Sequence, residues 1–159
     1  MKTHNYFITA VLFLVCCTNT FCQQWTYNKK VDEMTDETEY FAINIGTNNS
    51  GIKGKLELWS NGKVSISITK GFFAPSTAQY RLTVRFDKQP ALHLNCEGSS
   101  DRKTLFFPHP ISIINKIKAA KTMLVEFDFS TDHSGVFIDN PNLSTQLIKF
   151  NIADLKWEH

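Results

Sequence analysis

Two short runs of alternating apolar and polar residues flank the pair Asn61-Gly62, and this arrangement constrains the fold more than any other feature of the chain. The runs read KLELWS before the pair and KVSISIT after it. Asn-Gly between two such runs predicts a β-hairpin with a type I′ turn, because both residues accept its positive φ. Alternation places Leu56 and Leu58 on one face, and we expect the apolar residues across the turn to match them: Val64, Ile66 and Ile68.

Strand patterns continue along the rest of the chain. AQYRLTVRFD and ALHLNC alternate in the same way, and the later stretches TMLVEFDF and QLIKFNI have strand composition. One stretch differs, because HPISIINKIKAAKT begins with Pro110 and spaces Ile111, Ile114 and Ile117 three residues apart. This spacing predicts an amphipathic helix over about 110–121. We therefore expect a mainly β fold, an antiparallel β-sandwich or flattened barrel of about eight strands with one helix.

The first 22 residues are organised like a secretory signal peptide. Lys2 precedes the apolar run FITAVLFLVCC, and the small and polar residues TNTFC follow it. A membrane-spanning helix needs roughly 20 apolar residues, so this run is too short for an ordinary anchor. We expect cleavage after Cys22, or alternatively after Thr20. The product would be a single exported domain, residues 23–159, without a transmembrane segment, located in the periplasm or secreted.

Cleavage would also change the cysteine content of the chain. It would remove Cys16, Cys17 and Cys22 and leave Cys96 alone, which excludes an intrachain disulfide. The exported domain would then depend on its core for stability. A lipid anchor on one of the first three cysteines is the alternative. We expect Cys96 to be a small buried hydrophobe, because a catalytic thiol would need a histidine partner and an electropositive setting.

Five acidic side chains precede an abruptly apolar segment in VDEMTDETEYFAI, namely Asp32, Glu33, Asp36, Glu37 and Glu39. Carboxylates suit a hard cation, but calcium loops arrange their oxygens around a glycine turn, and no glycine lies within this cluster. We expect the acidic cluster to stay solvated ahead of a strand over Tyr40–Ile45. The alternative is a helical turn capped by Thr35 or Asp36.

The stretch DFSTDHSG is the second candidate for chemistry. Asp128, Ser130 and Asp132 alternate as in a calcium loop, but the glycine comes late and no closing glutamate follows. Asp132, His133 and Ser134 are adjacent, whereas the members of a catalytic triad converge from separate segments. The sequence therefore predicts no metal and no cofactor, and a small envelope hydrolase using Asp128, Asp132 and His133 is kept as an alternative.

Composition argues against two further classes of function. The seven glycines form no phosphate-binding loop, which argues against nucleotide chemistry. The net charge is +2 and the charged residues are scattered, so no basic stripe for nucleic acid is present. Two sequons begin at Asn48 and Asn142 and would be glycosylated only in a eukaryotic secretory route.

Two phenylalanine pairs, Phe72-Phe73 and Phe106-Phe107, fall in or beside expected loops. Adjacent residues of a strand point to opposite faces, so one member of each pair must face outward or be covered by another segment. Coverage by the helix or a loop is one interpretation. The other is that these four residues contribute to a partner-binding patch, which includes the stretch KGFFAPST.

The order of these segments resembles that of the small exported β-sandwich accessory proteins of type VI secretion clusters and, more loosely, invasion-associated locus B proteins. The residues that carry the likeness are Trp25, Arg85 with Asp87, the helix over 111–120, and the element 150–155. The cysteine expected in the first hairpin is absent, and LELWSNG takes its place. The resemblance implies an exported, non-enzymatic accessory protein in which Arg85 and Asp87 are structural and pair across a turn.

Together these features predict an exported, non-enzymatic binding or accessory protein that acts through contacts with a protein partner. Two other functions stay open. A barrel that carries a small lipophile would show an internal apolar cavity, and a small hydrolase would show titratable side chains converging in a pocket.

Overall fold

The computed structural model describes residues 25–75, 79–131 and 143–158. The expected signal peptide and most of the expected loop over 130–144 lie outside these residues. The described part of the chain forms ten strands and one helix. Their bounds are β1 Thr26–Val31, β2 Thr38–Thr47, β3 Lys53–Trp59, β4 Val64–Ile68, β5 Phe72–Phe73, β6 Tyr80–Phe86, β7 Leu92–Gly98, β8 Thr104–Phe106, α1 Pro110–Ala119, β9 Thr122–Ser130 and β10 Leu143–Asn151.

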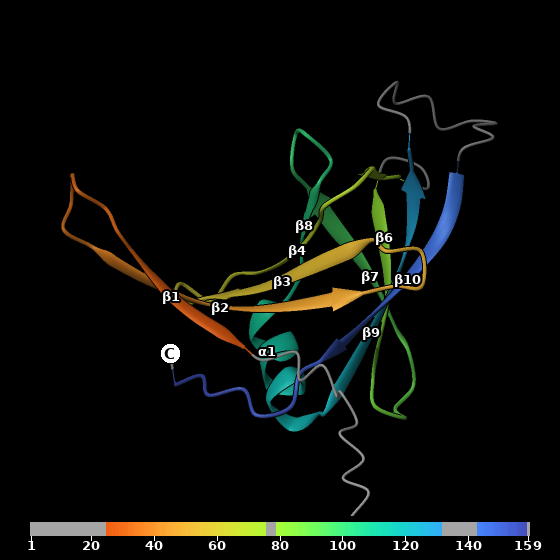
Figure 1. Ribbon diagram of the computed structural model, residues 1–159. Coiled ribbons are helices and arrows are strands. Elements are labelled where there is room, and N and C mark those ends of the chain that lie inside the picture. Colours follow the sequence, from red (N-terminus) through yellow and green to blue (C-terminus); the bar gives the residue numbers. More distant parts are fainter. Residues whose placement is uncertain (1–24, 76–78, 132–142, 159) are drawn as a thin grey trace, which may run out of the picture.

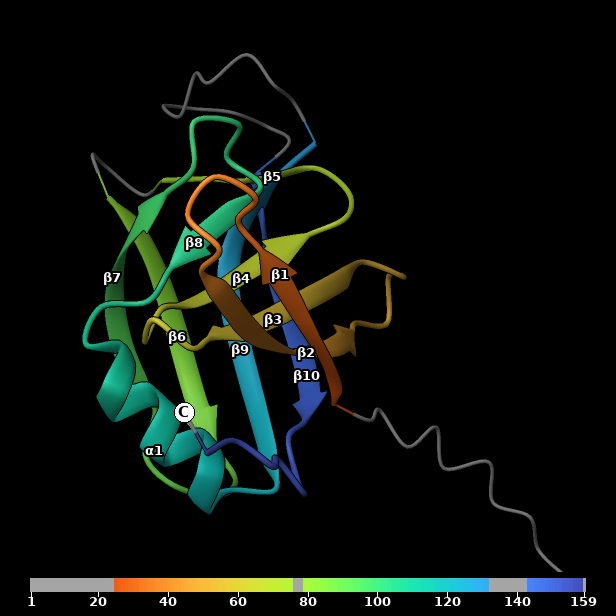
Figure 2. The ribbon, with the colours of Figure 1, turned by 90° about the vertical axis from the view of Figure 1, so that its left-hand side faces the viewer.

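Eight of the strands close into an antiparallel barrel (Figures 1 and 2). Their order is β2-β10-β9-β6-β7-β8-β4-β3, and β3 pairs again with β2, which completes the circle. The two extra strands extend the sheet, because β1 pairs with β2 and the short β5 pairs with β9. The mainly β prediction is confirmed, and of the two architectures left open the chain adopts the barrel.

The barrel interior is filled by the apolar positions that the alternation predicted. In the first hairpin, Leu56 and Leu58 are fully buried, and register pairs them with Ile66 and Val64. The largest side chains without solvent contact come from β3 to β10 and the segments beside them, among them Phe73, Phe86, Phe150, Leu82, Leu105 and Ile148. Large, close-packed side chains therefore occupy the space that the strands enclose.

Asn61-Gly62 does mark the predicted hairpin, but the turn type differs from the prediction. The backbone N–H of Gly62 donates to the carbonyl of Trp59 (2.9 Å), and the N–H of Trp59 donates to the carbonyl of Lys63 (2.9 Å). Gly62 has φ of 84°, whereas Asn61 does not have positive φ. The connection is therefore a type I turn followed by a glycine bulge, a three-residue loop, because only one residue takes the left-handed conformation that type I′ requires twice.

The single helix, α1, begins with Pro110 at its first position as predicted and ends at Ala119. It lies beside one end of the barrel (Figure 2) and buries Ile113, Ile114 and Ile117. Ile111 was expected on this apolar face, but 71% of its surface is exposed. Successive helical residues turn by about 100°, so Ile111 lies to the side of the face centred on the three buried isoleucines.

Two glycines face each other inside the barrel where β10 passes β2. Gly46 and Gly54 are register partners on β2 and β3, and both point inward. A Cβ on Gly46 would lie 2.7 Å from both Ile148 Cγ2 and the Lys149 carbonyl oxygen. A Cβ on Gly54 would lie 2.9 Å from Ile148 Cδ1 and 3.0 Å from Phe150 Cζ. The absence of side chains at these two positions thus makes room for β10 to close the barrel.

The positions that carried the family likeness have structural roles. Trp25 is buried, and its indole Nε1 donates to the carbonyl of Ile152 (3.2 Å), so it links the start of the barrel to the segment after β10. The resemblance implied that Arg85 pairs with Asp87, but the Asp87 carboxylate accepts hydrogen bonds from the backbone instead. Its Oδ1 accepts from the backbone N–H of Thr122 (2.8 Å) and of Lys121 (3.1 Å), which ties the turn after β6 to the start of β9.

The hairpin of β1 and β2 projects from the barrel (Figure 1), and the acidic cluster forms its exposed tip. The N–H of Asp32 donates to the carbonyl of Glu37 (2.8 Å), and Asp36 has a positive φ of 55° that reverses the chain. Asp32 Oδ1 accepts from the N–H of Met34 (2.8 Å). The interpretation of a solvated segment ahead of a strand is therefore correct. The segment also contains one helical turn, in which the N–H of Asp36 donates to the carbonyl of Asp32 (2.8 Å), but Asp32 caps it and not Thr35 or Asp36.

Candidate functional site

Each phenylalanine pair places one ring inside the barrel and one outside, as strand alternation predicts. Phe73 and Phe107 are 1% and 5% exposed, and Phe73 packs edge-to-face on Phe127 with ring centres 4.9 Å apart. Phe72 is half-buried and Phe106 is 41% exposed. Among the four predicted contact residues, only Phe72 and Phe106 thus present surface to a partner.

Phe72 is partly covered by two cations. The guanidinium carbon of Arg102 lies 5.2 Å from the centre of its ring, and Lys103 Nζ lies 5.6 Å from it. Cations at these distances are attracted to the negative face of an aromatic ring. The connection between β7 and β8 therefore covers this ring, and Phe106 is the more accessible member of the predicted set.

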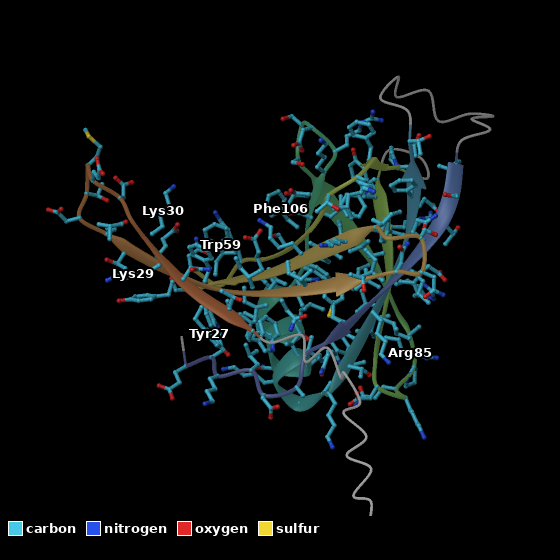
Figure 3. All side chains as sticks on the ribbon, in the orientation of Figure 1. Tyr27, Lys29, Lys30, Trp59, Arg85 and Phe106 are labelled. Atoms are coloured by element: carbon cyan, nitrogen blue, oxygen red, sulfur yellow. The ribbon has the colours of Figure 1, made fainter. Side chains whose placement is uncertain are left out.

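Phe106 forms one wall of a groove of about 330 Å³ on the outer face of β3, β4 and β8. We call it the aromatic groove, and the residues that matter for its chemistry are Glu57, Trp59, Lys63, Ser65, Thr104 and Phe106. Trp59 forms another part of the lining and stacks on Phe41 of β2, with ring centres 5.0 Å apart and planes 28° apart. Figure 3 shows Trp59 and Phe106 on the same side of the sheet.

Polar groups are held in fixed positions between the aromatic walls. Register places Ser65 directly between Glu57 and Phe106 on neighbouring strands. Glu57 is 8% exposed although it lies on the outer face, and its carboxylate pairs with Lys55 Nζ at 3.1 Å. Ser65 is 2% exposed. A partly desolvated acid and a serine between two aromatic side chains can orient a ligand by hydrogen bonds while the rings supply contact area.

A second hollow, of about 490 Å³, lies on the outer face of β6, β7, β9 and β10 and includes Asp128, one residue of the hydrolase alternative. His93 Nδ1 is 3.2 Å from Thr83 Oγ1, and Asp128 Oδ1 accepts from Thr145 Oγ1 at 3.3 Å. An activated nucleophile needs hydroxyl, base and orienting group in one hydrogen-bonded chain. In the described part of this hollow the contacts form two separate pairs. The other two residues, Asp132 and His133, lie outside the described residues.

Neither cysteine nor metal chemistry has a site in the residues that the structure describes. Cys96 is buried, and this burial raises the pKa of its thiol to about 12, so the thiolate that reacts or binds metal is suppressed. Within 25–75, 79–131 and 143–158, no group of three or more histidine, cysteine, aspartate or glutamate side chains could hold a metal ion.

Sequence reasoning found Phe106 but missed the rest of the aromatic groove. The signal for Trp59 and Glu57 was present, because an alternating strand with Leu56 and Leu58 inside must carry Glu57 and Trp59 outside. What alternation cannot show is that β8, more than forty residues later, pairs with β4 and brings Phe106 beside them.

Comparison with known proteins shows a likeness in fold. No protein-family model matches the sequence, and no curated protein matches it. The structure is similar to the crystal structure of invasion associated protein B from Bartonella henselae, with a TM-score of 0.50 and 10% sequence identity. The match covers 80% of this chain and 82% of that chain. The looser of the two family resemblances is thus confirmed at the level of the fold.

Proposed function

We propose that this protein is an exported, non-enzymatic binding protein that contacts a protein partner through the aromatic groove. The observation that carries the proposal is that an exposed Phe106 and a half-buried Trp59 flank a partly desolvated polar floor on the outside of a filled barrel. Aromatic side chains are enriched at the centres of protein interfaces, where they bury much area at a low cost in conformational entropy.

The filled interior favours surface binding over the carriage of a small lipophile. A lipophile-binding barrel keeps its central space free of side chains. Here Phe86, Phe150 and Ile66 are at most 2% exposed and occupy that space together with other large residues. Of the three residues of the hydrolase alternative the structure describes Asp128, which accepts from a threonine hydroxyl, while Asp132 and His133 lie outside the described residues.

Export is proposed from the organisation of residues 1–22. In the described part of the chain, no helix combines the length and the apolar character needed to cross a bilayer. The proposal predicts that N-terminal sequencing of the exported protein reads Gln23 as the first residue. A chain that retains Lys2 in the mature protein would contradict it.

A narrower form of this proposal adds the accessory role that the likeness to type VI secretion proteins suggests. The structural match with 10% identity supports a shared fold and leaves the role open. In the narrower form, the partner would be another envelope component, and the protein would act by holding it in place without chemistry.

The experiment that tests the proposal compares capture by two surface variants. Trp59→Ala combined with Phe106→Ser removes both walls of the aromatic groove, and Leu147→Ser removes an apolar residue of similar exposure (50%) on β10. Each tagged protein is incubated with the solubilised native envelope fraction, and the proteins it retains are quantified by mass spectrometry. We expect the groove variant to retain its partner at least about tenfold more weakly, with little change for Leu147→Ser.

Thermal melting of both variants must stay close to that of the parent protein for the comparison to hold. A partner retained equally by the parent and the groove variant would refute the aromatic groove as the contact surface. Equal loss in both variants would also refute it, because the contact would then depend on general surface hydrophobicity.

A further inference from the structure

The projecting strand β1 leaves one of its two edges unpaired. β1 is the terminal strand of the sheet order, and in the described residues only β2 pairs with it. The hydrogen bond from the N–H of Asp32 to the carbonyl of Glu37 fixes which groups face β2. In an antiparallel ladder the facing residues alternate, so the backbone groups of Tyr27, Lys29 and Val31 point away from β2, toward the open edge.

An open edge of this length is a template for a further strand. All six residues of β1 are exposed, and 48% of the Val31 surface is accessible to solvent. In the described structure the other long strands pair on both sides over at least part of their length, whereas the second edge of β1 is unpaired along the whole strand. Unpaired backbone donors and acceptors at such an edge gain hydrogen bonds when another strand docks.

The charges along β1 identify the strand that fits. The sequence Lys29-Lys30-Val31-Asp32-Glu33 reads plus, plus, neutral, minus, minus. Two antiparallel copies related by a two-fold axis at Val31 place Lys30 opposite Asp32 of the second copy, and they bring Lys29 beside the acidic turn that begins at its Glu33. Lys30 and the Asp32 of the second copy share a face of the sheet, because they are directly opposite. Val31 can lie on the two-fold axis, because its backbone N–H and carbonyl point toward the open edge and can bond to those of the second copy.

The surroundings of β1 admit this arrangement. Figure 3 shows Lys29 and Lys30 projecting from opposite sides of the ribbon, well away from the barrel. The C-terminal segment contacts β1 near its barrel end, where the N–H of Lys156 donates to Tyr27 Oη (2.7 Å). β1 ends at Val31, and Figure 1 shows this end of the strand pointing away from the barrel, so an antiparallel second copy extends outward and its barrel lies on the opposite side of the contact.

We propose that the protein self-associates through antiparallel pairing of two β1 edges centred on Val31, with Lys30–Asp32 contacts between the two copies and Lys29 beside the acidic turn of the second copy. The pairing joins two hairpins into a four-stranded ribbon. Its area is small and its ion pairs are exposed, so the dimer is weak, and it weakens further as salt screens the charges. The proposal is independent of the aromatic groove, which lies on the barrel.

The first test is a symmetric crosslink. Paired residues of an antiparallel hydrogen-bonded pair have Cα atoms about 5.5 Å apart, which a disulfide can span. We expect Val31→Cys, produced from the full-length sequence, to form a covalent dimer under mild oxidation. The matched control, Lys88→Cys in the exposed turn after β6, should stay monomeric under the same conditions. Cys96 does not interfere because it is buried. Equal crosslinking of both variants would overturn the proposal.

The second test exchanges charges. Lys30→Glu places two acidic pairs across the axis, and we expect about tenfold weaker association by sedimentation velocity at low salt. Lys88→Glu carries the same change in net charge and should have no effect. A mixture of Lys29→Glu/Lys30→Glu chains with Asp32→Lys/Glu33→Lys chains should form heterodimers although neither associates alone.

A third variant tests the backbone contact itself. Val31→Pro removes an N–H from the open edge while the bonds to β2 remain, so it should abolish association without unfolding the protein. Association that survives Val31→Pro, or a protein that is monomeric at every concentration tested, would overturn the proposal.

Discussion

The two inward-facing glycines give the sharpest prediction about stability, because the atoms that a methyl group would meet are known. In Gly54→Ala the new Cβ would lie 2.9 Å from Ile148 Cδ1 and 3.0 Å from Phe150 Cζ. These separations are about 0.5–1 Å shorter than an ordinary carbon–carbon contact. Overpacking of this kind costs about 1–3 kcal/mol, and part of that is offset by the lower backbone entropy of alanine, about 0.5–1 kcal/mol. We expect a net loss of roughly 1–2 kcal/mol.

A second substitution separates overpacking from other causes. Ile148→Val removes Cδ1, the atom nearest to the new methyl group, and alone should cost about 1 kcal/mol. Combined with Gly54→Ala it should cost less than the sum, with a coupling free energy of at least about 0.5 kcal/mol. Gly46→Ala is the matched control, since its Cβ would meet Ile148 Cγ2 and the Lys149 carbonyl oxygen, both at 2.7 Å, and Ile148→Val keeps both atoms. That pair should be additive.

Urea denaturation of the five single and double variants measures these free energies. Equal coupling for Gly46 and Gly54, or a Gly54→Ala protein more stable than the parent, would refute the reasoning that these positions are glycine so that β10 can approach.

The remaining predictions concern four other positions. Phe73→Ala should lower the free energy of unfolding in urea by about 3–5 kcal/mol. Phe72→Ala should lower it by about 1 kcal/mol or less, because this ring is half-exposed beneath two cations. Similar values for the two variants would contradict the assignment of the two rings to opposite faces. Backbone N–H groups, first that of Thr122, lower the pKa of Asp87, so its contribution to stability is present above the unfolded-state pKa of about 4 and is lost as pH falls through the lower folded value. Asparagine also tolerates the positive φ of this position, so Asp87→Asn tests the charge alone. The variant should have a lower free energy of unfolding than the parent, and this difference should shrink in acid; a difference independent of pH would contradict the prediction. At pH 8 iodoacetamide should leave Cys96 of the native protein unmodified, because the pKa of its thiol is raised to about 12, and should modify it in urea. Mass spectrometry detects the modification.

Local pattern was enough to predict strands where one face is buried and one exposed, and it failed where that contrast is missing. Leu82, Val84 and Phe86 alternate with polar residues, and β6 follows them as expected. β1 has the sequence TYNKKV and is exposed along its whole length, so no alternation marks it. The two-residue β5 and three-residue β8 are too short to show a period. β5 and β8 exist because partners distant in the sequence supply their hydrogen bonds, and β1 exists because β2, the next strand along the chain, pairs with it.

Closure of the sheet could not be predicted for the same reason. β2 and β10 are paired through Thr47 and Lys149, a hundred residues apart, and their approach depends on the glycines of β2 and β3. A glycine in a strand pattern indicates a close approach of another segment without naming it. The composition of the aromatic groove could not be predicted either, because Trp59 and Phe106 come together only through the pairing of β4 with β3 and β8.

The closed barrel determines where recognition can occur. Eight strands pair side by side around a filled interior, so contacts must come from outer faces, from edge stretches that neighbouring strands leave unpaired, or from what extends beyond the barrel. The aromatic groove is such a face, and Phe41, stacked on Trp59, belongs to β2 of the projecting ribbon and pairs with Asn28 of β1. A dimer through β1 would therefore join two aromatic grooves by one continuous sheet. Two weak sites fixed at one spacing bind a repeated or dimeric partner far more tightly than either site alone. Val31→Pro should then weaken capture of such a partner while a groove in the monomer still binds a single copy.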